Sequence, residues 1–348
     1  MRILVTGGAG FIGSNFVHYW VDRYPDDHVV VYDLLTYAGN RASLVDVEDR
    51  IVFVQGDICD RDLAEETLRA EQVEVVVNFA AESHNSLAVV DPARFFRTNV
   101  VGTQTFLDAS RAAGVERFHH VSTCEVYGDL PLESSETFRE DSPYRPRTPY
   151  NASKAGADHA VRAYFETFSL PITISNCSNN YGPYQFPEKL IPLMILNALD
   201  GKPLPVYGDG QNVRDWLYVE DHCRALTRVL EAGRVGETYC IGGDAERTNL
   251  QVVHAICAAV DALRPGLPHT PCGSLLTYVK DRPGHDRRYA MDTTKIRSEL
   301  GWRPEVDFEA GLERTVRWYL DNPEWVERVG SGSYRRERLG LSLAATGV

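Results

Sequence analysis

Two side chains that can exchange protons stand next to each other in the stretch VSTCEVYGDL. Its first residues have the character of a buried strand, and the loop that follows contains Thr123, Cys124 and Glu125. A thiol beside a carboxylate at the end of a strand indicates a reaction site, because both groups can give or take a proton. The chemistry depends on which partners the rest of the chain brings to this loop.

Tyr150 and Lys154 are the first such partners, in the stretch PYNASKAGAD. Residues four apart on a helix lie on one face. An ammonium group beside a phenol stabilises the phenolate and lowers its pKa from about 10 towards neutrality. The tyrosine then becomes a usable base for a sugar hydroxyl. This spacing also occurs in ordinary surface pairs, but the VST stretch upstream and the glycine motif near the N-terminus favour catalysis.

The glycine motif TGGAGFIG follows the first predicted strand and opens a helical pattern. Gly7, Gly10 and Gly13 permit a tight turn and a close approach of the backbone to a ligand. The helix N-terminus supplies free N–H groups and the positive end of a dipole for a pyrophosphate. We therefore expect a dinucleotide cofactor at this turn.

Two acidic residues refine the cofactor prediction. Asp33 ends the second strand, where a carboxylate hydrogen-bonds the ribose 2′-hydroxyl and repels a 2′-phosphate, so NAD is favoured over NADP. The alternative for Asp33 is a solvated turn acid. Asp57, after the third strand, is placed to reach the adenine amine, or else to cap the helix expected over 61–71.

Bulk composition narrows the class of protein. The chain has 348 residues, a net charge of −13, and ordinary hydrophobic and charged contents of 43% and 24%. The negative charge argues against general binding of nucleic acid or anionic membranes, and no apolar run approaches the length of a membrane span. Seven scattered cysteines without a C-x-x-C pair indicate neither a zinc site nor a redox pair. We expect a cytoplasmic protein without a signal peptide or a bound metal.

Six strand-like runs alternate with helical patterns, which predicts a Rossmann-like, doubly wound parallel sheet covered on both faces. The strand runs are RILV, HVVVYD, IVFVQGDI, EVVVNFAA, RFHHVST and PITISNCSNNYG, with helices over 61–71, 92–113 and 149–169. After about residue 180, proline and glycine turns separate helices near 189–200, 219–232, 249–263 and 308–320. We expect a cofactor domain over 1–180, a smaller interleaved mixed α/β domain over 181–334, and a tail over 335–348.

TGGAGFIG, VST and YNASK resemble the motifs of the extended short-chain dehydrogenase/reductase family. AAESH, EVYGDL, NNYGPYQFPEKLIPL, VRDWLYVEDH, GETYCIGG, RPGHDRRYAMD and ELGWRP are similar to its dTDP-glucose 4,6-dehydratase group, and the likeness runs from Met1 to about Tyr334. The resemblance implies an NAD-dependent hydro-lyase that acts on a dTDP-hexose. It also implies a homodimer, with helices near 92–113 and 149–169 packed across a two-fold axis.

The resemblance assigns a role to each catalytic position. Tyr150, activated by Lys154 and assisted by Thr123, removes the proton from the sugar O4 while NAD takes the hydride from C4. The resulting ketone acidifies the C5 proton, which Glu125 abstracts, and hydroxide leaves C6. The hydride returns to C6, so NAD stays bound through turnover.

Two stretches depart from the pattern of that group. The residue before the glutamate is an aspartate that acts as general acid there, and here it is Cys124. A thiol is a weaker acid and a weaker hydrogen-bond donor than a carboxylic acid. Cys124 is therefore either a substitute acid or a small neutral filler, with water or Glu125 doing the work. The group usually follows AAESH with VDRS, whereas this chain has NSLA from Asn85 to Ala88.

These departures leave other outcomes open. In a 5,6-dehydratase the hydride returns to C4 and the product is a 5,6-ene. A 4-epimerase needs no base at C5, so Glu125 counts against it. A cofactor-binding protein without turnover has no need of Tyr150 and Lys154. A change at a core catalytic position favours natural-product biosynthesis over cell-surface rhamnose.

The predicted site is a set of residues drawn from most of these motifs. For the cofactor it comprises Gly7, Gly10, Phe11, Ile12, Gly13, Asp33, Asp57, Ile58, Ala80, Ala81, Asn99, Ser122, Tyr150 and Lys154. For the nucleotide sugar it comprises Ser83, His84, Asn85, Thr123, Asn179, Glu188, Lys189, Leu190, Pro205, Tyr207, Arg214, Asn249, Arg282 and His285. His119 and His120 are expected at a strand end without a chemical role.

Overall fold

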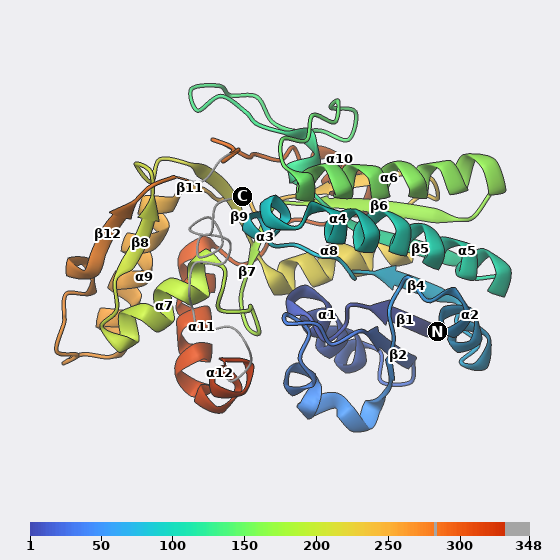
Figure 1. Cartoon of the computed structure of the whole chain (residues 1–348), viewed down its shortest axis with the longest axis horizontal. Helices are drawn as coiled ribbons and strands as arrows, with labels where there is room; N and C mark the ends of the chain where they lie inside the picture. The colour runs from blue at the N-terminus through green and yellow to red at the C-terminus, as the bar shows by residue number, and fades with distance from the viewer. Residues whose placement is uncertain (282–283, 331–348) are drawn as a thin grey trace.

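A seven-stranded parallel sheet organises the computed structural model, which describes residues 1–281 and 284–330 (Figure 1). Its strand order is β10-β6-β5-β4-β1-β2-β3. The strands are β1 (Arg2–Thr6), β2 (His28–Asp33), β3 (Ile51–Gln55), β4 (Val75–Asn78), β5 (Arg117–Thr123), β6 (Ile172–Cys177) and β10 (Thr238–Ile241). The predicted doubly wound sheet is confirmed, and β10 adds an edge strand that the strand patterns did not indicate.

Helices cover both faces of this sheet, because alternate residues of its strands are buried on opposite sides. Leu4 and Val30 pack in one hydrophobic cluster with residues of α2, α5 and α6, whereas Ile3 and Val31 pack in another with α1 and α8. These helices are α1 (Phe11–Arg23), α2 (Arg61–Ala70), α5 (Thr103–Ala113), α6 (Pro149–Phe168) and α8 (Val219–Ala232). Shorter helices are η1 (Arg41–Arg50), α3 (Asn85–Val90), η3 (Cys124–Tyr127), η4 (Cys272–Leu275) and α10 (Thr294–Leu300).

The helix expected over 92–113 is interrupted. It consists of α4 (Pro92–Phe96), a π-helical turn η2 (Arg97–Gly102) and α5. The wide turn holds the buried side chain of Asn99, whose amide nitrogen donates to the Glu82 carbonyl at 3.0 Å and to the Ser153 hydroxyl at 2.8 Å. π-turns of this kind commonly accompany functional sites.

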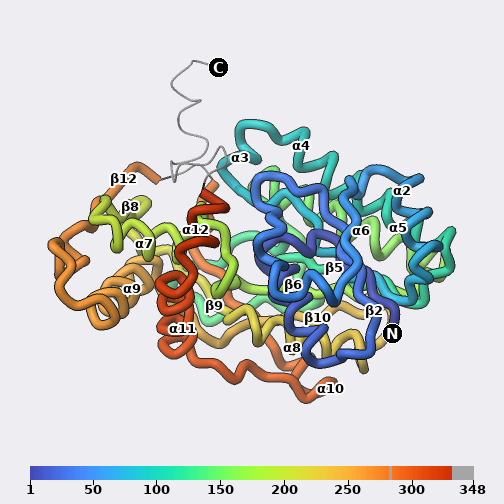
Figure 2. Tube along the Cα trace, turned by 90° about the horizontal axis from the view of Figure 1, so that it is seen from below, coloured from blue at the N-terminus to red at the C-terminus, as the bar shows by residue number. Residues whose placement is uncertain are grey.

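A second hydrophobic core lies to one side of the sheet (Figures 1 and 2). Its helices are α7 (Leu190–Asp200), α9 (Asn249–Leu263), α11 (Phe308–Asp321) and α12 (Pro323–Gly330). Its strands form a sheet of β7 (Asn179–Tyr181), β9 (Val213–Tyr218) and β11 (Glu246–Thr248), and a pair of β8 (Leu204–Tyr207) and β12 (Leu276–Val279). The predicted sixth strand is thus divided: β6 stays in the large sheet, and β7 pairs with β9 in the second part.

The chain returns to the first core after entering the second. Leu226 on α8, Tyr239 on β10 and Ile296 on α10 are buried with residues of α1 and β1. The division into two domains at residue 180, with the second partly interleaved with the first, stays a prediction. The tail 335–348 lies outside the described residues. Over residues 1–281 and 284–330, no helix has the length and apolar character that crossing a membrane requires.

Candidate active site

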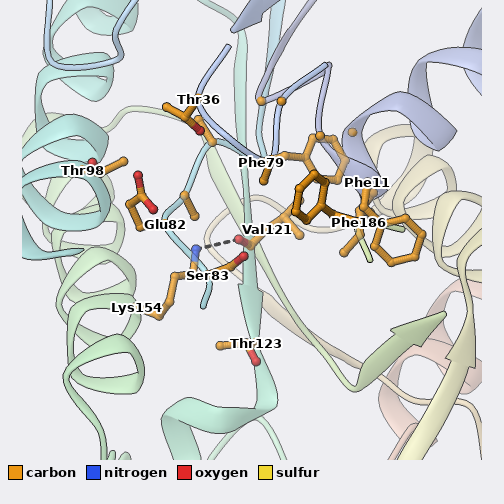
Figure 3. Close-up of a pocket in the computed structure, with 18 of the residues that line it drawn as sticks. Phe11, Thr36, Phe79, Glu82, Ser83, Thr98, Val121, Thr123, Lys154 and Phe186 are labelled. Carbon is orange, nitrogen blue, oxygen red and sulfur yellow. Dashed lines mark hydrogen bonds between the residues drawn. The ribbon is translucent and has the colours of Figure 1, made fainter. Parts of the chain in front are cut away.

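One cavity of about 330 Å³ collects the chemistry-bearing residues at the carboxyl ends of the parallel strands. This is the edge at which doubly wound sheets bind ligands, where the strand order reverses between β1 and β4. The glycine turn after β1 forms one wall, and the loop after β5 and helix α6 form another. Residues between 179 and 189 close the cavity from the second part. Figure 3 shows Lys154 directed at Val121, with Glu82 and Thr98 on the same side of the view and Phe11 and Phe186 on the opposite side.

The glycine turn fits a dinucleotide phosphate. A Cβ atom on Gly13 would lie 2.2 Å from the Gly7 carbonyl oxygen, so the turn is closed to any larger residue. Helix α1 begins after Gly10, and no side chain caps its start. The N–H groups of its first turn, which lie in the wall of the cavity, are therefore available to a ligand. Backbone donors at an uncapped helix start are the groups that a pyrophosphate needs.

The two cofactor acids differ in their surroundings. Asp33 is buried, and its carboxylate accepts hydrogen bonds from the Ala9 and Leu35 amides at 3.0 and 2.8 Å. Burial raises the pKa of Asp33, while those two amides oppose the rise. Asp57 accepts from Arg97 at 3.0 Å. The alternative role for Asp57 as a helix cap is wrong, because Asp60 caps α2 by accepting from the Leu63 amide.

Tyr150 lies at the start of α6, where it is buried with Ala88 and Phe95. Burial raises the pKa of Tyr150, and the Glu125 carboxylate raises it further, while a hydrogen bond with Thr123 opposes the change. The expected lowering of this pKa by Lys154 is therefore wrong for the protein chain taken alone. The Lys154 ammonium instead donates to the Val121 carbonyl at 2.9 Å, as the dashed line in Figure 3 shows.

Beneath Lys154 lies a buried polar network that the sequence patterns did not indicate. The Lys154 ammonium and the Asp158 carboxylate each lie 3.4 Å from Nε2 of His120. Asn78 donates to Nδ1 of His120 at 3.0 Å, and the Thr6 hydroxyl fixes the amide by donating to its oxygen at 2.6 Å. Nε2 of His120 therefore carries the proton and points at Asp158. The only sequence signal was the four-residue spacing of Asp158 from Lys154 on one helix face.

The groups of this network shift one another's pKa values. Burial lowers the pKa of Lys154, and Asp158 opposes the fall. Burial tends to raise the pKa of Asp158, but His120 and Lys154 together outweigh it and hold the value low. Burial lowers the pKa of His120 to about 4, so the ring is neutral at physiological pH. The neutral His120 ring thus lies next to both a buried ammonium and a buried carboxylate. That His120 has no chemical role stays a prediction.

Cys124 lies in the cavity wall and is almost completely buried. It packs with Val126, Tyr127 and Phe138 in an apolar cluster. Burial raises the pKa of the Cys124 thiol well above its usual range, and the charge of Glu125 adds to the rise. The thiol is therefore neutral and holds its proton tightly.

The cavity brings together most of the predicted residues. Its lining includes Gly7, Gly10, Phe11, Ile12, Gly13, Asp33, Asp57, Ile58, Ala80, Ala81, Ser83, Ser122, Thr123, Cys124, Glu125, Tyr150, Lys154, Asn179, Glu188 and Lys189. Asn99 stands behind the wall, joined to the backbone of Glu82. The remaining predicted sugar-nucleotide residues are not part of this lining, namely His84, Asn85, Leu190, Pro205, Tyr207, Arg214, Asn249 and His285, and Arg282 lies outside the described residues.

Several of these outer residues have other partners. The Arg214 guanidinium donates to the Val213 and Asp286 carbonyls at 2.7 and 2.8 Å and lies over the Tyr289 ring. The rings of Tyr207 and His285 are 6.5 Å apart, edge to face. Their contacts with a nucleotide stay predictions.

Comparison with known proteins gives the family of the chain. Residues 4–315 match the family model described as GDP-mannose 4,6 dehydratase. The dTDP-glucose 4,6-dehydratase of Neisseria meningitidis serogroup B is 54% identical over 97% of this chain and 99% of its own length. The Streptomyces venezuelae dTDP-glucose 4,6-dehydratase, solved with NAD bound, superimposes with a TM-score of 0.88 at 50% identity, covering 94% of this chain and 100% of its own. The Thermotoga maritima UDP-glucose 4-epimerase superimposes with a TM-score of 0.83 at 29% identity, covering 93% and 100% of the two chains.

The parallel sheet, the glycine turn and the Tyr150–Lys154 helix together define an extended short-chain dehydrogenase/reductase. Within that class, the chain belongs to the GDP-mannose 4,6 dehydratase family and to its dTDP-glucose 4,6-dehydratase-like group. The resemblance of the sequence motifs to this group is confirmed.

Proposed function

We propose that the protein is an NAD-dependent hydro-lyase that converts dTDP-glucose to dTDP-4-keto-6-deoxyglucose. The observation that carries the proposal is one cavity that joins a dinucleotide turn to a tyrosine, a lysine and a second base, Glu125. Relatives about half identical over nearly the whole chain are named dTDP-glucose 4,6-dehydratase, which supports this activity over other reactions of the class.

The residues divide the reaction between two bases. NAD supplies a reversible hydride acceptor when it is bound at the glycine turn. Tyr150 takes the O4 proton, and the positive charge of the Lys154 ammonium partly offsets the burial and the Glu125 charge that raise the pKa of Tyr150. Glu125, two residues from Thr123, takes the C5 proton once the neighbouring carbon is a ketone. Separating the two proton transfers between two side chains lets oxidation and elimination follow each other in one cavity.

The alternative outcome is a 5,6-dehydratase that returns the hydride to C4. Both dehydrations lose the C6 hydroxyl, so the acid strength of Cys124 affects both and favours neither. A buried neutral thiol with a raised pKa is a poor general acid, so departure of the C6 hydroxyl receives less help from this position than from an aspartic acid. The retained Glu125 counts against the 4-epimerase, which removes no C5 proton. The position of C6 relative to the nicotinamide separates the two dehydration courses.

The deciding experiment is proton NMR of the product made from dTDP-glucose that carries deuterium at C4. We expect a deuterated C6 methyl group beside a C4 ketone. Exomethylene signals with deuterium at C4 would replace the proposal by the 5,6-dehydratase, and a 4-epimer would replace it by the epimerase. Tyr150→Phe, which keeps the ring and removes the hydroxyl, should lower product formation by roughly 100-fold or more; full activity in this variant would contradict the role of Tyr150.

The protein is further proposed to be a cytoplasmic homodimer that serves natural-product biosynthesis. Support for the dimer comes from exposed apolar side chains on α3, α4 and η2. Val89, Val90, Phe96 and Val101 have between 42% and 54% of their surface exposed. Apolar side chains gathered in one stretch favour a protein partner over water.

A further inference from the structure

A chain of hydrogen bonds connects Glu125 to the start of the catalytic helix. The Asn85 side-chain amide donates to Oε2 of Glu125 at 3.1 Å. The Thr148 hydroxyl donates to the oxygen of the same amide at 2.9 Å. Thr148 is also the N-cap of α6, where its hydroxyl accepts from the Asn151 amide at 3.2 Å.

This arrangement permits one orientation of the Asn85 amide. The Thr148 hydroxyl, whose oxygen accepts from Asn151, can either donate its proton to the Asn85 amide or accept from it, whereas the ionised Glu125 carboxylate can only accept. The Asn85 oxygen therefore faces Thr148, and its NH₂ group faces Glu125. The carboxylate cannot donate when ionised, so the reversed amide would set two acceptors against each other.

The contact matters because Glu125 must be a charged base with a defined direction. A hydrogen bond donated to a carboxylate holds one of its oxygens in place. The other oxygen, Oε1, is then left for the C5 proton. Cys124 carries no charge, and its thiol belongs to an apolar cluster, so it does not share this task.

The structure assigns Asn85 as a positioning residue for Glu125, oriented by Thr148, for the elimination step. This inference rests on the proposed dehydratase function. Asn85 was expected to contact the sugar. In this assignment it acts on the reaction by positioning the base Glu125. Because Thr148 lies two residues before Tyr150, the two bases of the reaction are both held by the N-terminus of α6.

Asn85→Val tests the assignment, since valine keeps a similar size and removes the donor. With dTDP-glucose in a single turnover, C4 oxidation should give an NADH absorbance that rises within about twofold of the wild-type rate. Its decay, and the exchange of the C5 hydrogen with D₂O, should be roughly 10- to 100-fold slower, the usual effect of losing a hydrogen bond to a charged group. The KM for dTDP-glucose should stay within about twofold of the wild-type value, because Asn85 acts on the base and not on the sugar.

Thr148 offers a matched pair of controls. Thr148→Val removes the hydroxyl and should slow the decay of NADH absorbance. Thr148→Ser keeps the hydroxyl, so its decay rate should be faster than that of Thr148→Val and close to that of the wild type. Ser86→Ala, next to Asn85, should leave both rates unchanged. Thermal unfolding of each variant separates loss of the helix cap from loss of the bond to Glu125.

Equal slowing of oxidation and elimination, or an unchanged elimination rate in Asn85→Val, would overturn the assignment. A large rise in KM with both rates retained would restore the sugar-contact role. Absence of NADH and product in the wild type would refute the proposed function instead. Infrared difference spectra then still test the contact between Asn85 and Glu125, with Glu125→Gln used to identify the Glu125 carboxylate band. This band should shift between the wild type and Asn85→Val. An unshifted band would refute the contact.

Discussion

At the scale of single residues, the charge of Lys154 depends on one buried carboxylate, that of Asp158, one turn further along the same helix. Lys154 is buried, and burial favours its neutral form. Asp158 offsets that effect through the neutral ring of His120, which lies between the two charges. The positive charge of Lys154, which Tyr150 needs, is therefore maintained by the buried Asp158 carboxylate and not by solvent.

Removing this carboxylate should change the pH dependence of oxidation. In Asp158→Asn the factor that raises the pKa of Lys154 is lost, so the pKa falls further and the ammonium deprotonates at a lower pH. The alkaline limb of NADH formation should move to lower pH, with a roughly tenfold lower rate on that limb and a smaller change near neutrality.

Stopped-flow absorbance of NADH across a pH series measures this shift. Glu166→Gln is the matched control, because Glu166 is an exposed acid on the same helix. A profile in Asp158→Asn that coincides with the wild type would show that Asp158 does not maintain the charge of Lys154.

At the scale of secondary-structure elements, the interrupted helix around η2 presents two different faces. Inward, Asn99 and Phe95 are buried against the cavity wall and the catalytic helix. Outward, Phe96 and Val101 are 42% and 51% exposed. The same element that supports the cofactor cavity thus provides the proposed dimer surface.

A charge placed on this surface should separate the proposed dimer. Val101→Asp would bury an unpaired carboxylate between protomers, which costs several kcal/mol and favours the monomer. Sedimentation velocity at micromolar concentration measures the change. Val235→Asp places the same charge on an exposed valine after α8 and should leave the oligomeric state unchanged. A Val101→Asp protein with the sedimentation coefficient of the wild type would exclude this surface from the interface.

At the scale of the whole molecule, three buried histidines should make the fold sensitive to acid. Burial lowers the pKa of His119 and His222 to about 3 and that of His120 to about 4. In the unfolded chain each has its ordinary pKa near 6.5. Below that value the unfolded state binds more protons than the folded state, so stability falls as the pH falls.

Each of these histidines should lower the free energy of unfolding by about 2 kcal/mol when the pH falls from 7 to 5. Urea unfolding at the two pH values measures the total loss, to which carboxylates also contribute. In His222→Gln, which removes one of the three, the loss should be smaller by about 2 kcal/mol whatever the absolute stability of the variant. An identical loss in both proteins would show that His222 does not titrate on unfolding.

Strand and helix patterns were sufficient for most of the fold. Apolar runs buried on both faces predicted the parallel sheet, and the helices α2 and α6 lie within a residue of the expected 61–71 and 149–169. The patterns missed β10, four residues long, and the division at Ser178 between β6 and β7. Such short strands are defined by their neighbours in the sheet, and a local pattern does not contain that information.

For the candidate site, residue type and spacing were enough to find the side chains that carry the chemistry. These are the glycine turn, Asp33, and the Tyr150–Lys154 pair, together with the departure at Cys124. Only the tertiary structure decided their surroundings. It placed Asp158 and His120 beneath Lys154, and it joined Asn85 to Glu125. Hydrogen bonds and pKa shifts depend on distance, burial and direction between segments far apart in the chain, and these quantities exist only after the chain has folded.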